Sequence, residues 1–213
     1  TGSLCFLESL MLNIKSIQSG IKHLNQVMEE SADELNAADG LLGDGDLGVT
    51  MIRGFRSLLE ELESLPTDIG MAFFQCAKAF TKTSGSSYGT LLATGMMAVA
   101  KAKKGHTEIK LDEVSGLFNI SLEAMQMRGK ASLGDKTVLD VIAAARDAAK
   151  NQTDWDSMLN NINKAIEDTI ELFRERQSKI GRARIFGEKS IGIDDPGMLA
   201  FKRIFESLQT QTN

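Results

Sequence analysis

Three aspartates and four glycines occupy the ten residues from Asp39 to Gly48 of this 213-residue chain. Carboxylates held this close together repel one another unless a cation lies among them. Oxygen ligands of this kind suit hard divalent cations such as Mg²⁺, Mn²⁺ or Ca²⁺. A helical pattern begins at Thr50, and the N–H groups at the start of a helix favour an anion, typically phosphate. Asp39, Asp44 and Asp46 therefore indicate a site for a nucleotide that carries a divalent metal.

An ordinary turn is an equally good interpretation of this stretch when it is considered alone, because Asp and Gly are the usual turn residues. The run from Asp44 to Gly48 is not an EF-hand loop, since it lacks the third acidic position and the closing Glu. The rest of the chain therefore has to decide between a metal site and a turn.

Three further loops interrupt the helical patterns. The hydroxyls of residues 83–90 suit phosphate oxygens, although Ser and Thr before a helix more often cap it. Gly134–Thr137 reads Gly-Asp-Lys-Thr, which is not a Walker A motif because no predicted strand precedes it. Arg182 and Arg184, in the loop 181–197, suit phosphate and a solvated surface equally well. The sequence offers no evident nucleophile or catalytic base, and phosphoryl transfer assisted by metal ions needs none.

Composition argues against several classes of protein. A net charge of −5 disfavours a nucleic-acid or anionic-membrane partner, and no apolar run is long enough to span a bilayer. The apolar fraction of 42% and the charged fraction of 25% are typical of soluble globular proteins. Cys5 and Cys76 offer neither a disulfide framework nor the spacing of a metal site, so we expect both in the core. A cytoplasmic protein is expected.

Apolar residues recur at helical spacing along most of the chain, which predicts one all-α domain over residues 1–213, with its motifs between about 20 and 208. Eight or nine helices joined by short loops are expected. They cover residues 4–13, 20–37, 51–62, 69–80, 88–103, 111–125, 138–150, 154–179 and 198–208. No alternating pattern predicts a regular strand, and only residues 184–186 suit a short extended piece.

The polar segments form an ordered set between Leu35 and Gly197. They are Leu35–Asp39, Gly43–Gly48, Ser84–Gly85, Tyr88–Thr90, Gly134–Thr137, Gly181–Ala183, Gly187–Gly192 and Asp195–Gly197. Each segment is weak evidence alone, but the ordered set is specific. It resembles the signature of the nucleotide-binding L subunit (DhaL-like) family of dihydroxyacetone kinases.

This resemblance implies an antiparallel barrel of eight helices with the nucleotide at one end. It also implies that Asp39, Asp44 and Asp46 hold two Mg²⁺ ions, which bind the phosphates of ADP or ATP. The other nucleotide contacts that it implies are the backbone of Leu47, Gly48, Val49 and Thr50, the turn at Thr83 and Ser84, Arg182 on the β-phosphate side, and an adenine and ribose pocket at Gly129, Val138, Asp195, Pro196 and Gly197.

The resemblance further implies a subunit of a ketose kinase. Such a subunit transfers a phosphoryl group to a short-chain ketose, such as dihydroxyacetone, that a separate K subunit holds covalently through a histidine. The resemblance leaves the source of the phosphoryl group open. It is either exchangeable ATP or a tightly held ADP that a phosphotransferase-system protein rephosphorylates in place. The second is typical of bacterial L chains without a K domain. A homodimer is compatible with either.

Two positions depart from the family pattern. Leu47 replaces a common histidine, and Thr81-Lys82 stands where a Gly-Gly pair is usual, so Lys82 would have to compensate with its charge. Two competing hypotheses stay open at this point. One is a non-catalytic nucleotide-binding regulator that docks on a transcription factor. The other is an all-α interaction module without Mg-dependent nucleotide binding.

Overall fold

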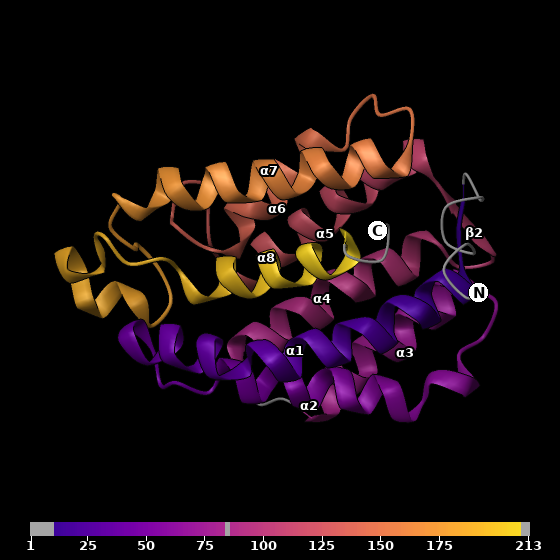
Figure 1. The fold of residues 1–213 in the computed structure, drawn as a ribbon, viewed down its shortest axis with the longest axis horizontal. Coiled ribbons are helices and arrows are strands. Elements are labelled where there is room, and N and C mark those ends of the chain that lie inside the picture. The colour runs from indigo at the N-terminus through magenta and orange to yellow at the C-terminus, as the bar shows by residue number, and fades with distance from the viewer. Residues whose placement is uncertain (1–10, 84–85, 210–213) are drawn as a thin grey trace.

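Eight α-helices form a closed ring in the part of the chain that the structure describes, residues 11–83 and 86–209 of a computed structural model (Figure 1). They are α1 (Ile14–Leu42), α2 (Leu47–Glu60), α3 (Ile69–Thr83), α4 (Ser87–Ala102), α5 (Val114–Gly129), α6 (Val138–Ala148), α7 (Trp155–Arg174) and α8 (Pro196–Gln209). Each helix packs against the next, and α8 packs against α1, which closes the ring. The predicted all-α fold is confirmed. Within these residues, no helix combines the length and the apolar character needed to cross a lipid bilayer.

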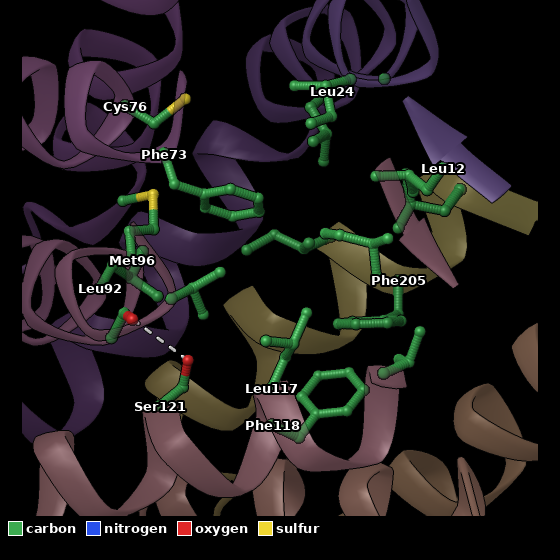
Figure 2. A pocket seen from close by; sticks show the side chains of 18 of the residues that line it. Leu12, Leu24, Phe73, Cys76, Leu92, Met96, Leu117, Phe118, Ser121 and Phe205 are labelled. Atoms are coloured by element: carbon green, nitrogen blue, oxygen red, sulfur yellow. Dashed lines mark hydrogen bonds between the residues drawn. The ribbon is translucent and has the colours of Figure 1, made fainter. Parts of the chain in front are cut away.

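Apolar side chains line the inside of the ring in two clusters. One cluster is built mainly from α1 to α4 and includes Cys76, which is buried as predicted, whereas the other is built mainly from α5 to α8. Side chains from both clusters surround a cavity of about 410 Å³, and Figure 2 shows Leu24, Phe73 and Phe205 pointing towards it from three different helices. Its wall is almost entirely aliphatic and aromatic. The hydroxyl of Ser121 in this wall donates to a backbone carbonyl of α4.

Two short strands lie outside what the sequence pattern predicts. Strand β1 (Met11–Asn13) pairs antiparallel with β2 (Glu108–Lys110), and three residues are too few to show an alternating pattern. The helix predicted for residues 4–13 is therefore wrong over 11–13, whereas residues 4–10, with Cys5, lie outside the described part of the chain. The described residues also form three 3₁₀ helices: η1 (Leu62–Ser64), η2 (Leu111–Glu113) and η3 (Ala183–Ser190), the last replacing the extended piece predicted at 184–186.

Helix α1 is longer at both ends than the predicted 20–37. It begins at Ile14 because the side chain of Asn13 accepts hydrogen bonds from the Lys15 and Ser16 amides. It continues to Leu42, which is buried two turns beyond the buried Leu35. The residues between these two leucines are partly buried or exposed and carry no apolar pattern, so periodicity alone ends the helix too early. As a consequence, Asp39 lies on the last turn of a helix and not in a loop.

Gly70 lies so close to a neighbouring segment that an added methyl group there should destabilise the fold, whereas one at Gly116 should not. A Cβ there would lie 2.4 Å from the Lys104 nitrogen and 2.5 Å from the Ala100 carbonyl oxygen, which are backbone atoms of the neighbouring segment. We expect Gly70→Ala to lower the free energy of unfolding by about 1–3 kcal/mol or more, measured by urea denaturation. Gly116→Ala is the control, since a Cβ there meets open space, and it should raise stability by about 0.5–1 kcal/mol. Equal effects would contradict this account.

Candidate metal centre

Three carboxylates converge where α1 passes into α2. Asp39 lies on the last turn of α1, Asp44 lies in the connection between α1 and α2, and Asp46 is the residue directly before α2. Each offers a carboxylate oxygen, and these oxygens all lie within 4.8 Å of one another. Asp39 is partly buried, whereas Asp44 and Asp46 are exposed. The structure thus brings the three aspartates singled out in the sequence into one cluster, open to solvent on one side.

Asp39 also shapes the connection that carries the other two acids. Its Oδ2 accepts hydrogen bonds from the amides of Gly45, at 2.9 Å, and Asp46, at 3.0 Å. Gly45 adopts a φ of +77°, a conformation that favours glycine. A Cβ at Gly43 would lie 2.4 Å from Asp39 Oδ1. Two glycines of this stretch are therefore required to fold the loop around the Asp39 carboxylate.

Asn36 holds the start of α2 against α1. Its Oδ1 accepts from the amides of Gly48, at 2.8 Å, and Val49, at 3.3 Å. A Cβ at Gly48 would lie 2.1 Å from the Ala32 carbonyl oxygen, so this glycine serves the approach of the two helices. The helix begins at Leu47, ahead of the predicted Thr50. Sequence reasoning missed Asn36, although it precedes Asp39 by one helical turn and so shares its face.

The side chains at the start of α2 divide between the core and the surface. Leu47 and Thr50 are buried, and Leu47 belongs to the core cluster of α1 to α4, whereas Val49 is exposed. The apolar Leu47 side chain therefore fills core space.

The second departure from the family pattern, Thr81-Lys82, continues α3, and the Thr81 hydroxyl donates to the Ala77 carbonyl. Lys82 is exposed on the last turn of that helix.

Arg182 reaches the acid cluster from a distant part of the chain. It lies in the segment between α7 and α8 and forms an ion pair with Asp44. The Arg182 guanidinium holds the pKa of Asp44 below its usual value, chiefly through their hydrogen bond. Asp44 in turn raises the pKa of Arg182, and the charges of Asp46 and Asp39 add to this effect. One guanidinium thus partly offsets three neighbouring carboxylates.

The turn before α8 is fastened to α4. The Tyr88 hydroxyl donates to the Gly197 carbonyl at 3.0 Å, and Asp195 Oδ1 accepts from the Met198 amide at 2.9 Å. A Cβ at Gly197 would lie 3.0 Å from the Tyr88 ring, so glycine is needed for this contact. Pro196 is the first residue of α8, where its missing N–H costs nothing. Burial raises the pKa of Asp195 to about 7.

The remaining candidate residues lie at other helix ends. Gly129 is the last residue of α5, and Val138, the first of α6, is only 3% exposed and belongs to the core. Thr83 ends α3, and Ser84 lies outside the described residues. Figure 1 shows the α1–α2, α5–α6 and α7–α8 connections at the same end of the ring. Gly129, Val138 and the turn before α8 therefore lie at the same end as the acid cluster, with the Val138 side chain turned inward.

A ring of up-and-down helices with a carboxylate cluster and an arginine at one end defines a class of all-α protein with a candidate metal and phosphate site. Comparison with known families identifies it further. Residues 41–210 match the profile of the DAK2 domain, and the chain belongs to this family.

Several relatives are similar over most of the chain. A Lactococcus lactis protein named PTS-dependent dihydroxyacetone kinase, ADP-binding subunit DhaL, is 32% identical over 93% of this chain and 97% of its own length. The Escherichia coli PEP-dependent dihydroxyacetone kinase, ADP-binding subunit DhaL, is 26% identical over 88% of this chain and 92% of its own. The rat triokinase/FMN cyclase is 31% identical, but the match spans 32% of that longer protein.

Solved structures share the fold. The dihydroxyacetone kinase of C. freundii superposes with a TM-score of 0.73 at 22% identity, covering 99% of this chain and 36% of the kinase chain. The same kinase in complex with AMP-PNP and Mg²⁺ gives a TM-score of 0.71 at 23% identity. The ring of helices in this chain is therefore a known architecture, found there as about a third of a larger protein.

The raised pKa of Asp195 predicts that the stability of the fold depends on pH. This pKa rises from an ordinary 3.8 to about 7 in the folded state, so the folded protein binds this proton more tightly than the unfolded chain does. The contribution of Asp195 to stability therefore falls as the pH rises from about 4 to about 7. Asp195→Asn removes the charge but keeps a good helix cap. Urea denaturation from about pH 5 to pH 8 should show a smaller loss of stability in this variant, and parallel curves would contradict the assignment.

Proposed function

We propose that this chain is the ADP-binding subunit of a dihydroxyacetone-type ketose kinase. The observation that carries the proposal is the convergence of Asp39, Asp44 and Asp46 with Arg182 at one end of the ring. Membership of the DAK2 domain family and the names of the Lactococcus lactis and Escherichia coli relatives support it. The acceptor is a short-chain ketose held by a separate K-type subunit, and the site of action is the cytoplasm.

The donor atoms of the acid cluster fit magnesium. They are all carboxylate oxygens, and they lie close enough to share one ion or a pair of ions. Bound Mg²⁺, two ions in our proposal, would neutralise charge on the nucleotide phosphates, and such electrostatic stabilisation together with positioning supplies most of the catalysis in phosphoryl transfer. Asp39 would also keep its two backbone hydrogen bonds and so hold the loop in shape.

Arg182 is placed to share its charge between the acids and a phosphate. Its ion pair with Asp44 is exposed, so an incoming phosphate can reach the guanidinium without opening the core. A planar guanidinium suits two phosphate oxygens at once. We assign the amides of residues 47–50 and the turn at Thr83 and Ser84 to the phosphates as well. For Gly48, Val49 and Thr50 this requires an exchange of partner, because Asn36 holds the first two amides and the Asp46 carbonyl holds the third.

The adenine and ribose are assigned to the ends of α5, α6 and α8. Gly129, Asp195, Pro196 and Gly197 lie at these ends, and Val138 would contribute its backbone because its side chain is buried. We propose that the chain acts as one domain and that the nucleotide is a retained ADP. A phosphotransferase-system protein would then rephosphorylate the ADP in place, as the names of the bacterial relatives suggest.

Bound nucleotide is the direct test of this proposal. The purified protein is dialysed with Mg²⁺ and then denatured, and the released material is analysed by mass spectrometry. We expect ADP in near-stoichiometric amount, and transfer of phosphate to dihydroxyacetone when a K-type subunit and the phosphotransferase-system donor are added. Complete loss of ADP on dialysis with activity on free ATP would favour ATP as an exchangeable substrate. Bound nucleotide without transfer would favour a regulator, and absence of nucleotide binding would contradict the proposal.

The acid cluster should be essential for nucleotide binding but not for folding. We expect Asp44→Asn and Asp46→Asn each to weaken Mg-ADP affinity about tenfold or more in calorimetry, because each removes a ligand charge. The helical circular dichroism should persist, since loss of one charge relieves repulsion among the carboxylates. Asp112→Asn, which changes an exposed acid on η2, is the control and should leave the affinity unchanged. Unchanged affinity in both site variants would disprove the metal assignment.

A further inference from the structure

Lys136 is a buried lysine in the connection between α5 and α6, within the segment Gly134–Thr137. It is 1% exposed. Its Nζ donates to the carbonyls of Arg174 at 3.1 Å, Arg176 at 2.8 Å and Ser190 at 2.8 Å. An ammonium has three N–H groups, so these bonds use its whole donor capacity. The lysine therefore cannot reach out to a phosphate and acts on its own protein.

The three acceptors of Lys136 lie at the two ends of one segment. Arg174 is the last residue of α7, Arg176 follows it closely, and Ser190 is the last residue of η3. The ammonium thus closes the intervening residues into a loop. Two of these carbonyls lie at or just beyond the end of α7, which stops at Arg174, ahead of the predicted residue 179. Positive charge is favourable at this position, the C-terminal end of a helix.

Further bonds brace the base of this loop. The Ser190 hydroxyl accepts from the Ser178 amide at 2.9 Å and donates to the Gly187 carbonyl. The Lys179 amide donates to the Asp135 carbonyl at 3.1 Å, which links the loop to the neighbour of Lys136. Arg182 lies within this loop, just before η3, and pairs with Asp44. The position of Arg182 over the acids thus depends on a loop whose two ends are fixed at Lys136.

The backbone of Lys136 gives a second, independent sign that this residue is held in place. Its φ is +64°, in the left-handed region that non-glycine residues rarely adopt. Such a conformation has a cost and persists only where the surroundings over-determine it. Three hydrogen bonds from a side chain in a fully enclosed position provide that constraint.

We propose that Lys136 is a positioning residue, which holds Arg182 against the acid cluster and thereby sets the affinity for the Mg-nucleotide. This inference rests on the proposed function, since the affinity that it concerns is that of the proposed site. Lys136 acts through Arg182 and touches no ligand. Its effect must therefore disappear when Arg182 is absent.

A double-mutant cycle tests this dependence. Lys136→Met keeps the length and bulk of the side chain but removes all three donors, and Arg182→Gln removes the guanidinium. We expect Lys136→Met alone to weaken the affinity for Mg-ADP, measured by calorimetry, at least about fivefold. In the Arg182→Gln background the same change should have no further effect. Equal weakening in both backgrounds, or none in either, would overturn the inference.

Lys103→Met is the matched control. Lys103 is another buried lysine, 4% exposed, whose Nζ donates to Glu113 Oε1 at 2.5 Å in the neighbourhood of η2. Its replacement should lower the thermal unfolding temperature without changing Mg-ADP affinity, which separates lost stability from lost positioning. A drop in affinity equal to that of Lys136→Met would overturn the inference.

A milder variant covers the case in which Lys136→Met does not fold. Lys136→Gln keeps a shorter donor group, and we expect an intermediate loss of affinity that again vanishes in the Arg182→Gln background. A full-strength loss that persists there would count against positioning. If the unsubstituted protein bound no Mg-ADP, the proposed function itself would fail, whereas every other adverse result affects the role of Lys136 alone.

Discussion

Repulsion among three carboxylates is the constraint that organises one end of this molecule. Asp39, Asp44 and Asp46 lie within a few ångströms of one another, and such a cluster persists only if the fold holds it. Two backbone amides hold the Asp39 carboxylate, the rigid last turn of α1 carries it, and one guanidinium from a distant loop offsets the charge. Each of these supports depends in turn on packing elsewhere in the ring.

The ring supplies that packing by placing successive helices side by side. Three connections that are far apart in the sequence meet at one end because the helices run up and down and α8 returns to α1 (Figure 1). Polar side chains then fasten these connections to one another: Asn36 joins α1 to α2, Tyr88 joins α4 to α8, and Lys136 joins the α5–α6 connection to the end of α7. The site is thus a product of several loops on a rigid apolar scaffold.

The sequence predicted the helices and the cluster of aspartates, because both depend on local spacing. It predicted the ends of helices less well. Leu42 extends α1 beyond the visible pattern, and α7 stops at Arg174, where a lysine from another connection binds the carbonyl of this last residue. Periodicity contains no information about such long-range hydrogen bonds. The same limit explains why Gly-Asp-Lys-Thr, rejected as a phosphate loop, showed no role until the acceptors of Lys136 were known.

The contact between the first and last helices has a consequence for the order of the chain. Helix α1 runs towards the acid cluster and α8 runs away from it, so the end of α8 lies beside the first turns of α1, where a Cβ at Gly20 would lie 3.8 Å from Leu208. A ring held by contacts between neighbours does not depend on where the backbone is interrupted. A circular permutant that joins α8 to α1 and opens the connection between α2 and α3 would keep every neighbour in place, far from the aspartates.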